Sequence, residues 1–268
     1  MFIAISLLTS FSILLVMMFL AKQRENTFLR QYQLIVTLRQ LLLLIRQSRS
    51  NTHYGISAEK NLASQLTNLN SRLTDKSHQL VTISPFESKP NYRVFQQMLK
   101  SLTLDWRTRS VAKNQMVHGK AIRHCLFLID EVMIAWLVES GRQDLSTEYH
   151  HHWQQIVDAM EVLTKLRISI QDISTKEGFQ QAQYCCDKMR RTINQLSIIS
   201  PLTLTSPACN KALQTLSELI NNPDFPHTTQ ALYDLTNDIS LNIARVYDQI
   251  LSDLIEQLYL PLPMERIA

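Results

Sequence analysis

The sequence predicts an all-α protein: a helical bundle, arranged as two stacked four-helix-type bundles and preceded by one N-terminal transmembrane helix. Three observations lead to this fold class. Only 4 glycines and 8 prolines occur in 268 residues, and aromatic residues make up only 7% of the chain. Leu, Gln, Ile, Ser and Thr are abundant, which favours long helices over a many-stranded sheet. Apolar residues also recur at helical spacing between short breaks.

The first element is a membrane anchor. Residues 1–21, MFIAISLLTSFSILLVMMFLA, carry no charge and can cross a hydrocarbon core at about 1.5 Å per residue. No Lys or Arg precedes this segment and no A-x-A site ends it, so an uncleaved anchor is favoured over a signal peptide. Lys22, Arg24 and Arg30 follow at once. The positive-inside rule therefore predicts a single-pass protein of the inner (cytoplasmic) membrane with its body in the cytoplasm.

The remaining elements follow in order along one helical domain, residues 22–264. The anchor helix is expected to continue to about residue 50, with Phe28, Tyr32, Ile35, Leu38, Leu42 and Ile45 on one stripe. Pro85 and Pro90 predict a loop over 84–91, and Gly141 and Pro201 predict two helix ends. The further helices are expected at about 56–82, 92–102, 105–140, 146–173, 176–199, 206–222 and 228–259. No internal repeat suggests a solenoid.

Several function classes are disfavoured by the composition. The sequence has no G-x-S-x-G, H-E-x-x-H or C-x-x-C motif and no glycine-rich phosphate loop, so we do not expect an enzyme. The net charge of +4 is mild and the basic residues are scattered, so nucleic acid is not an expected partner. The four cysteines, including the adjacent Cys185 and Cys186, are expected to be free buried thiols, although a redox-active vicinal pair stays an alternative.

The triplet His150, His151 and His152 invites a metal hypothesis. Ligands on one helix share a face when they are three or four residues apart, whereas three consecutive side chains fan out over about 200°. His118 and His124 are six residues apart and do not share a face either. A solvated polar patch is therefore the preferred interpretation of the triplet, and neither a metal nor a cofactor is expected.

Arginine is the more informative residue type. On the first helix, Arg49 follows Leu42 at heptad spacing, and Arg46 lies one turn from Leu42. On a later helix the apolar series that begins at Trp153 reaches Arg167 where the pattern expects a leucine. Two helices thus each carry a guanidinium on the stripe that faces the core.

Three interpretations of these arginines remain open. The aliphatic stems could be buried while the charged heads reach water near the helix ends. The charges could be paired inside the bundle with Asp75, Asp130 or Asp172. Alternatively, arginines from separate helices could hold one small anion, because the planar guanidinium fork binds planar oxyanions in a bidentate manner.

Two stretches of the sequence are similar to a known family. LIRQSRSNTHYGIS and LNSRLTDKSHQL (69–80) resemble the opening of the nitrate- and nitrite-sensing (NIT) domain of bacterial receptors and antitermination regulators. That domain begins with H-E-L-Q-x-E-R-G and continues to R-x-T-D. Arg49 falls on the arginine of E-R-G, and Arg72, Thr74 and Asp75 fit R-x-T-D. The residues that depart from the first motif are Leu43, Leu44, Arg46, Ser48 and Ser50.

The resemblance implies a pair of helical bundles that bind nitrate or nitrite through arginines from several helices, and a role in signal transduction. The ligands would be Arg49 and Arg46, with Arg167 on the opposing helix and Arg123 and Arg190 (or Arg191) as further candidates. We expect no output domain after the bundle, and therefore expect a separate signalling protein as partner. Whether the protein forms a homodimer stays open. The alternative is a ligand-free helical scaffold at the membrane.

Overall fold

The computed structural model describes residues 2–57, 62–104, 106–201, 206–222 and 228–263. This part of the chain contains eight α-helices, three short 3₁₀ turns and no strand, which confirms the predicted fold class. The helices are α1 (Phe2–Ser57), α2 (Ala63–Ile83), α3 (Lys89–Thr103), α4 (Val111–Ser140), α5 (Ser146–Ser169), α6 (Lys176–Ile199), α8 (Pro207–Asn221) and α9 (Thr229–Leu258). The 3₁₀ turns are η1 (Trp106–Thr108), η2 (Gln143–Leu145) and η3 (Ile170–Asp172).

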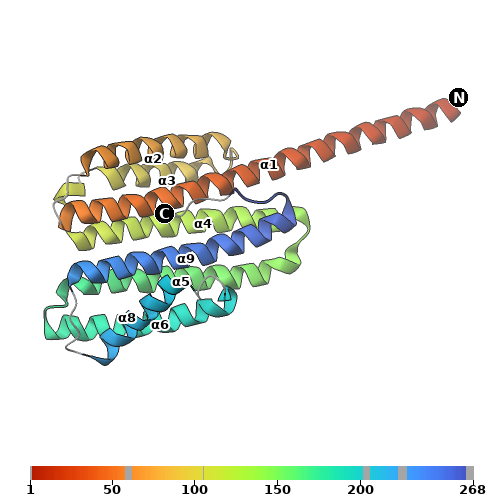
Figure 1. Cartoon of the computed structure of the whole chain (residues 1–268). Coiled ribbons are helices and arrows are strands. Elements are labelled where there is room, and N and C mark those ends of the chain that lie inside the picture. Colours follow the sequence, from red (N-terminus) through yellow and green to blue (C-terminus); the bar gives the residue numbers. More distant parts are fainter. Residues whose placement is uncertain (1, 58–61, 105, 202–205, 223–227, 264–268) are drawn as a thin grey trace.

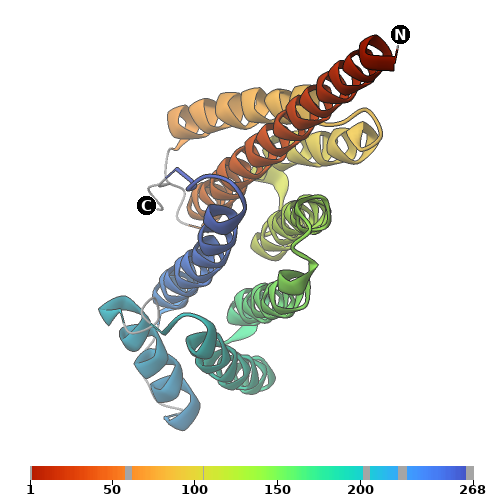
Figure 2. The same ribbon diagram turned by 90° about the vertical axis from the view of Figure 1, so that its right-hand side faces the viewer.

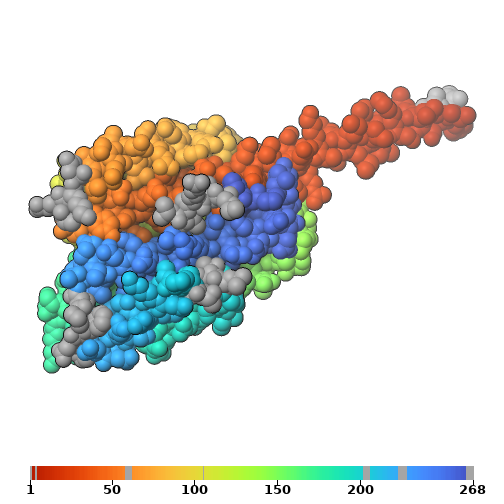
Figure 3. Space-filling view, viewed as in Figure 1, coloured from red at the N-terminus to blue at the C-terminus, as the bar shows by residue number. Residues whose placement is uncertain are grey.

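Helix α1 is unusually long, and only its second half belongs to the bundle. Its first half projects from the body as a single helix (Figures 1 and 3). The large apolar side chains on that projection, such as Phe2, Phe11 and Phe19, are exposed. This segment is the one part of the described chain that is long and apolar enough to cross a membrane.

The body is built from two groups of four helices that are stacked on each other. Helices α1 to α4 pack in a closed ring of neighbours, and α5, α6, α8 and α9 form the second ring. The layers succeed one another from α2 and α3, through α1 and α4, to α9 and α5, and finally to α8 and α6 (Figures 1 and 2). Helices α1, α4, α5 and α9 are therefore the four inner helices, and they enclose the centre of the molecule.

The predicted apolar stripe of α1 forms part of the core. Ile35, Leu38 and Ile45 are fully buried and Leu42 is nearly so, while Phe28 packs against the cluster from its edge. Helices with one apolar face gain most of their stability from such burial, at roughly 25 cal/mol per Å² of apolar surface. The stripe thus fixes which side of α1 faces the inner helices, and with it the side on which Arg49 lies.

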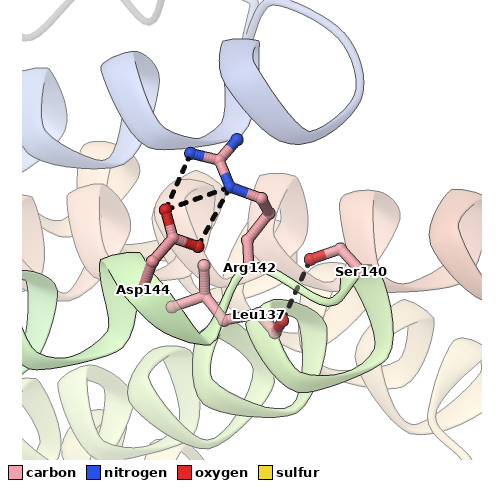
Figure 4. A network of polar contacts seen from close by, with 4 residues as sticks. All are labelled: Leu137, Ser140, Arg142 and Asp144. Carbon is pink, nitrogen blue, oxygen red and sulfur yellow. Dashed lines mark hydrogen bonds and ion pairs between the residues drawn. The ribbon is translucent and has the colours of Figure 1, made fainter.

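A tight corner reverses the chain between α4 and α5. Gly141 has a φ of 75°, in the left-handed region that a glycine tolerates, and the backbone N–H of Arg142 donates to the carbonyl of Leu137 at 2.9 Å. Figure 4 shows this corner, where the Arg142 side chain pairs with Asp144 and the Ser140 hydroxyl donates to Leu137 O. The corner satisfies the last carbonyls of α4 and joins the two rings of helices.

Some predicted helix boundaries were wrong, each for a local reason. Helix α1 runs to Ser57 instead of about residue 50, because no Gly or Pro interrupts it before Gly55. Gly55 lets the backbone of α1 approach the Trp106 ring closely, since an added Cβ would lie only 2.7 Å from that ring. Helix α2 is described from Ala63 instead of 56, with 58–61 outside the described residues.

Two other helix starts also differ from the prediction. Helix α3 begins at Lys89 with Pro90 in its first turn, where proline costs no hydrogen bond. Helix α4 begins at Val111, because the Ser110 hydroxyl accepts from Lys113 N and caps it there. The earlier start expected at residue 105 lies outside the described residues.

Candidate functional site

Arg49 projects from α1 into the centre of the molecule. It is 3% exposed, and its Nη2 donates to the Ser240 hydroxyl of α9 at 3.0 Å. Its Nε is buried without any hydrogen-bond partner. One neutral hydroxyl is a weak counterpart for a buried cation, because removing a charge from water costs several kcal/mol unless an opposite charge compensates. Arg49 is therefore incompletely satisfied.

Arg167 reaches the same place from α5. It is 1% exposed and donates from Nε to the Thr236 hydroxyl at 3.1 Å and from Nη2 to the Thr236 carbonyl at 2.8 Å. Thr236 and Ser240 are one turn apart on α9, so their side chains are neighbours on one face of that helix. Arg49 of α1 and Arg167 of α5 thus contact adjacent turns of α9.

Arg46 completes the group one turn before Arg49 on α1. The residue is partly buried, and its Nε and Nη2 are inaccessible and have no hydrogen-bond partner. Within the described residues no carboxylate lies within 4 Å of the guanidinium of Arg46, Arg49 or Arg167. We call these three side chains the arginine cluster.

Burial and the neighbouring arginine charges both disfavour the charged forms of Arg49 and Arg167. Burial, and then the charge of Arg46, lowers the pKa of Arg49 to about 9. Burial and the charges of Arg49 and Arg46 lower the pKa of Arg167 well below its usual value. Burial lowers the pKa of Arg46 to about 10, and the charge of Asp248 is among those that oppose this shift. Guanidinium keeps its proton in proteins, so the cluster concentrates positive charge that repels itself in a medium of low dielectric constant.

Neutral polar groups line the α4 side of the cluster. The His118 ring donates from Nδ1 to the Asn114 carbonyl at 2.9 Å, because a carbonyl can only accept, and its Nε2 then accepts from the Ser48 hydroxyl at 3.2 Å. The amide of Asn114 donates to the Thr52 hydroxyl at 2.9 Å. These bonds tie α1 to α4 beside Arg49 without supplying any negative charge.

His53 lies one turn beyond Arg49 on α1 and is 2% exposed. Its ring packs on Tyr233 of α9, with 4.0 Å between the ring centroids, and neither ring nitrogen has a hydrogen-bond partner. Burial, and then the charges of Arg167 and Arg49, lower the pKa of His53 to about 4. The imidazole is therefore neutral at physiological pH and faces the arginine cluster.

The pKa values of the two buried histidines make stability dependent on pH. Burial also lowers the pKa of His118 to about 4, against 6.5 for an exposed histidine. In the unfolded chain the two imidazole groups become protonated below about pH 6.5, whereas in the folded chain they stay neutral down to about pH 4. The free energy of unfolding therefore falls as the pH falls through that range. We expect a loss of about 2 kcal/mol per histidine between pH 7 and pH 5. Asp130, whose pKa is raised by burial to about 6, opposes part of the loss.

Urea unfolding of the wild type and of His118→Gln at both pH values measures this effect. The variant is expected to lose less stability on acidification than the wild type. If both proteins lost the same free energy of unfolding between pH 7 and pH 5, His118 would not have a lowered pKa in the folded state.

The sequence analysis missed a buried arginine next to the cluster. Arg39 on α1 is 5% exposed and makes a bidentate pair with Asp248 on α9, through Nε–Oδ1 at 2.7 Å and Nη2–Oδ2 at 2.6 Å. Its heptad spacing from Arg46 could have revealed it. Arg39 thus has its charge neutralised by a bidentate carboxylate partner. None of the three cluster arginines has such a partner among the described residues.

The structure does not bring the other candidate arginines to the cluster. Arg123 on α4 lies 3.9 Å from Glu161 of α5. Arg190 and Arg191 both pair with Asp187 on the outer side of α6. Arg191 is exposed, and Arg123 and Arg190 are half-buried with their guanidinium groups turned to these carboxylates.

The residues of the R-x-T-D stretch also lie away from the cluster. Arg72, Thr74 and Asp75 are exposed on α2, and the Thr74 hydroxyl donates to the Asn70 carbonyl of its own helix. Of the residues that carried the resemblance, only Arg49 and its neighbours on α1 therefore contribute to the interior. Asp75 is too far out to be the internal partner that the sequence left open.

The remaining motifs behave as ordinary structural features. All four cysteines are free thiols and buried, as predicted, so Cys185 and Cys186 are not bonded to each other. His150 and His151 are exposed, and His151 shares a hydrogen bond with Gln155. The described residues contain no group of three His, Cys, Asp or Glu side chains that could hold a metal ion.

Comparisons with protein-family models, with curated proteins and with solved structures gave no match to this chain. What the arginine cluster can bind therefore has to be argued from its charge and its geometry. It combines positive charge with unused guanidinium donors, which are the features by which proteins recognise small anions.

Proposed function

We propose that this protein is a membrane-anchored sensor that binds a small planar oxyanion, nitrate or nitrite, at the arginine cluster and signals through a partner protein. One observation carries the proposal: three guanidinium groups from two helices are buried, and among the described residues none of them has a carboxylate within 4 Å. A fold that tolerates this arrangement has to offset its cost, and a bound anion offsets it directly.

The choice of a planar oxyanion rests on the donors and on the resemblance. The orphan donors are the Nε of Arg49 and the Nε and Nη2 of Arg46, and guanidinium donors lie in one plane with fixed spacing. Oxygen atoms that are themselves coplanar can accept from such a fork in pairs. The similarity of the Arg49 region to the NIT domain favours nitrate or nitrite within this class.

Helix α1 offers a route from the cluster to the membrane. It continues without a break from the exposed apolar segment to Arg46 and Arg49, about 40 Å from Ala21 at 1.5 Å per residue. An anion between α1 and α5 would reduce the repulsion between their arginines and favour a closer arrangement of the two helices. A partner that contacts α1, or the outer face of the bundle, would detect that change.

Thermal unfolding of the full chain in detergent tests the proposal. Nitrate or nitrite is expected to raise the melting temperature, because a ligand of the folded state stabilises it by about 2.7 kcal/mol at one hundred times its Kd. For a chain of this size that corresponds to a rise of several degrees. Chloride and sulfate at equal ionic strength should produce a smaller rise.

Two variants separate the site from general salt effects. Arg167→Gln removes one cluster member and should make the melting temperature insensitive to nitrate. Arg123→Gln removes the same charge from the surface of α4 and should respond like the wild type. If nitrate and chloride act equally on all three proteins, the oxyanion proposal is wrong.

A further inference from the structure

The buried ring of His53 carries an inference beyond the arginines. Its two nitrogens have no partner, although a buried polar group without a hydrogen bond costs about 1–3 kcal/mol. The ring is not loosely placed, because Tyr233 packs on one side and Tyr54 touches it edge-on, with 5.5 Å between ring centroids. Tyr233 is itself held to α5 through a hydrogen bond from its hydroxyl to the Arg167 carbonyl at 3.3 Å.

The position of His53 relative to the arginine cluster indicates what its nitrogens face. His53 and Arg49 are four residues apart on α1, so their side chains lie one above the other on the same face. The orphan Nε of Arg49 and the orphan nitrogens of His53 therefore belong to neighbouring side chains on one face of α1, and the charges of Arg167 and Arg49 both act on the imidazole. The acidic group that acts on the ring is Asp234, which accepts a hydrogen bond from Tyr54.

We propose that His53 is a further ligand of the anion, donating one ring N–H to an oxygen atom, and that it sets the preference for an oxyanion over a halide. The inference rests on the proposed function. Arginine charge attracts any small anion. A neutral N–H in a fixed position adds no charge. It strengthens the binding only of an anion that places an oxygen atom within hydrogen-bonding distance of it.

Substitutions of His53 in the full chain, with nitrate and chloride as titrants, test this role. His53→Phe keeps a ring against Tyr233 and removes the donor, and His53→Gln keeps an N–H donor. His124→Phe is the matched control, because His124 also stacks on an aromatic ring, that of Phe95 at 5.3 Å, but lies outside the cluster. Titration calorimetry in detergent at pH 7.5 gives both Kd values for each protein.

We expect the nitrate Kd of His53→Phe to rise tenfold or more, the loss typical of a hydrogen bond to a charged group, and the chloride Kd to change less than threefold. His53→Gln should stay within about threefold of the wild type for nitrate, and His124→Phe should match the wild type. An unchanged nitrate Kd in His53→Phe, or an equal loss for both anions, would overturn the role of His53 while leaving the arginine site intact. Absence of nitrate binding in the wild type would overturn the proposed function and this inference together.

Discussion

Replacing Arg49 by methionine is expected to raise the stability of the anion-free protein and to abolish its response to nitrate. Methionine has a similar length and can occupy the same space, whereas the guanidinium is buried beside Arg46 and Arg167 with its Nε unpaired. Exchanging buried ions for apolar side chains of similar volume has stabilised other proteins by about 1–4 kcal/mol. We expect a gain of about 1–3 kcal/mol, measured by urea unfolding in a buffer free of nitrate, nitrite and halide.

The sign of this change, together with the response to nitrate, separates an anion site from a ligand-free scaffold. If Arg49 only joined α1 to α9 through Ser240, its removal would cost stability and nitrate would be irrelevant. Arg123→Met is the control. The Arg123 side chain is only half-buried and its distance to Glu161 is 3.9 Å, so the change should alter stability by no more than about 0.5 kcal/mol. A large loss of stability in Arg49→Met would contradict the anion-site account.

Replacing Asp248 by asparagine is expected to destabilise the protein by about 2–4 kcal/mol. Asp248 neutralises Arg39, whose side chain is 4% exposed, and its charge also acts favourably on Arg46. Removing one partner of a buried pair leaves the other charge uncompensated, which typically costs 3–5 kcal/mol. The expected value is somewhat smaller, because the side chain of Asp248 is 28% exposed. Urea unfolding at neutral pH measures it.

A matched change on the same helix provides the control. Asp253→Asn, at an exposed position of α9 that contacts Gln249, should alter stability by less than about 0.5 kcal/mol. The double variant Arg39→Leu with Asp248→Leu should recover most of the loss, since no buried charge then remains unpaired. If Asp248→Asn proved as mild as Asp253→Asn, the Arg39–Asp248 pair would not be a significant link between α1 and α9.

The fold and the centre of the site could be predicted from apolar periodicity. The stripe through Ile35, Leu38 and Leu42 indicated the inner face of α1. Arg46 and Arg49 follow on or beside this stripe. The series from Trp153 led to Arg167 in the same way. Periodicity succeeds here because the position of a residue around the helix axis decides whether it faces the interior, whether its side chain is apolar or charged.

The parts that could not be predicted depend on contacts between helices far apart in the sequence. Whether Arg39 is paired is decided by Asp248, which is 209 residues away, and no local pattern reveals that contact. Arg123 and Arg190 lie near apolar faces but turn to Glu161 and Asp187 at the surface. His53 could not be predicted, because a single histidine near a helix end does not indicate whether its ring nitrogens have hydrogen-bond partners. That depends on Tyr233, which packs against the ring from α9.

A crystal structure of the full chain grown with nitrate tests the central claim most directly. The account predicts density for one planar anion in contact with Arg46, Arg49 and Arg167, within about 3 Å of the Nε of Arg49, the usual length of such a hydrogen bond. His53 should donate to the same anion. Density for water alone at that position, or a carboxylate of this chain paired with the cluster, would contradict the account.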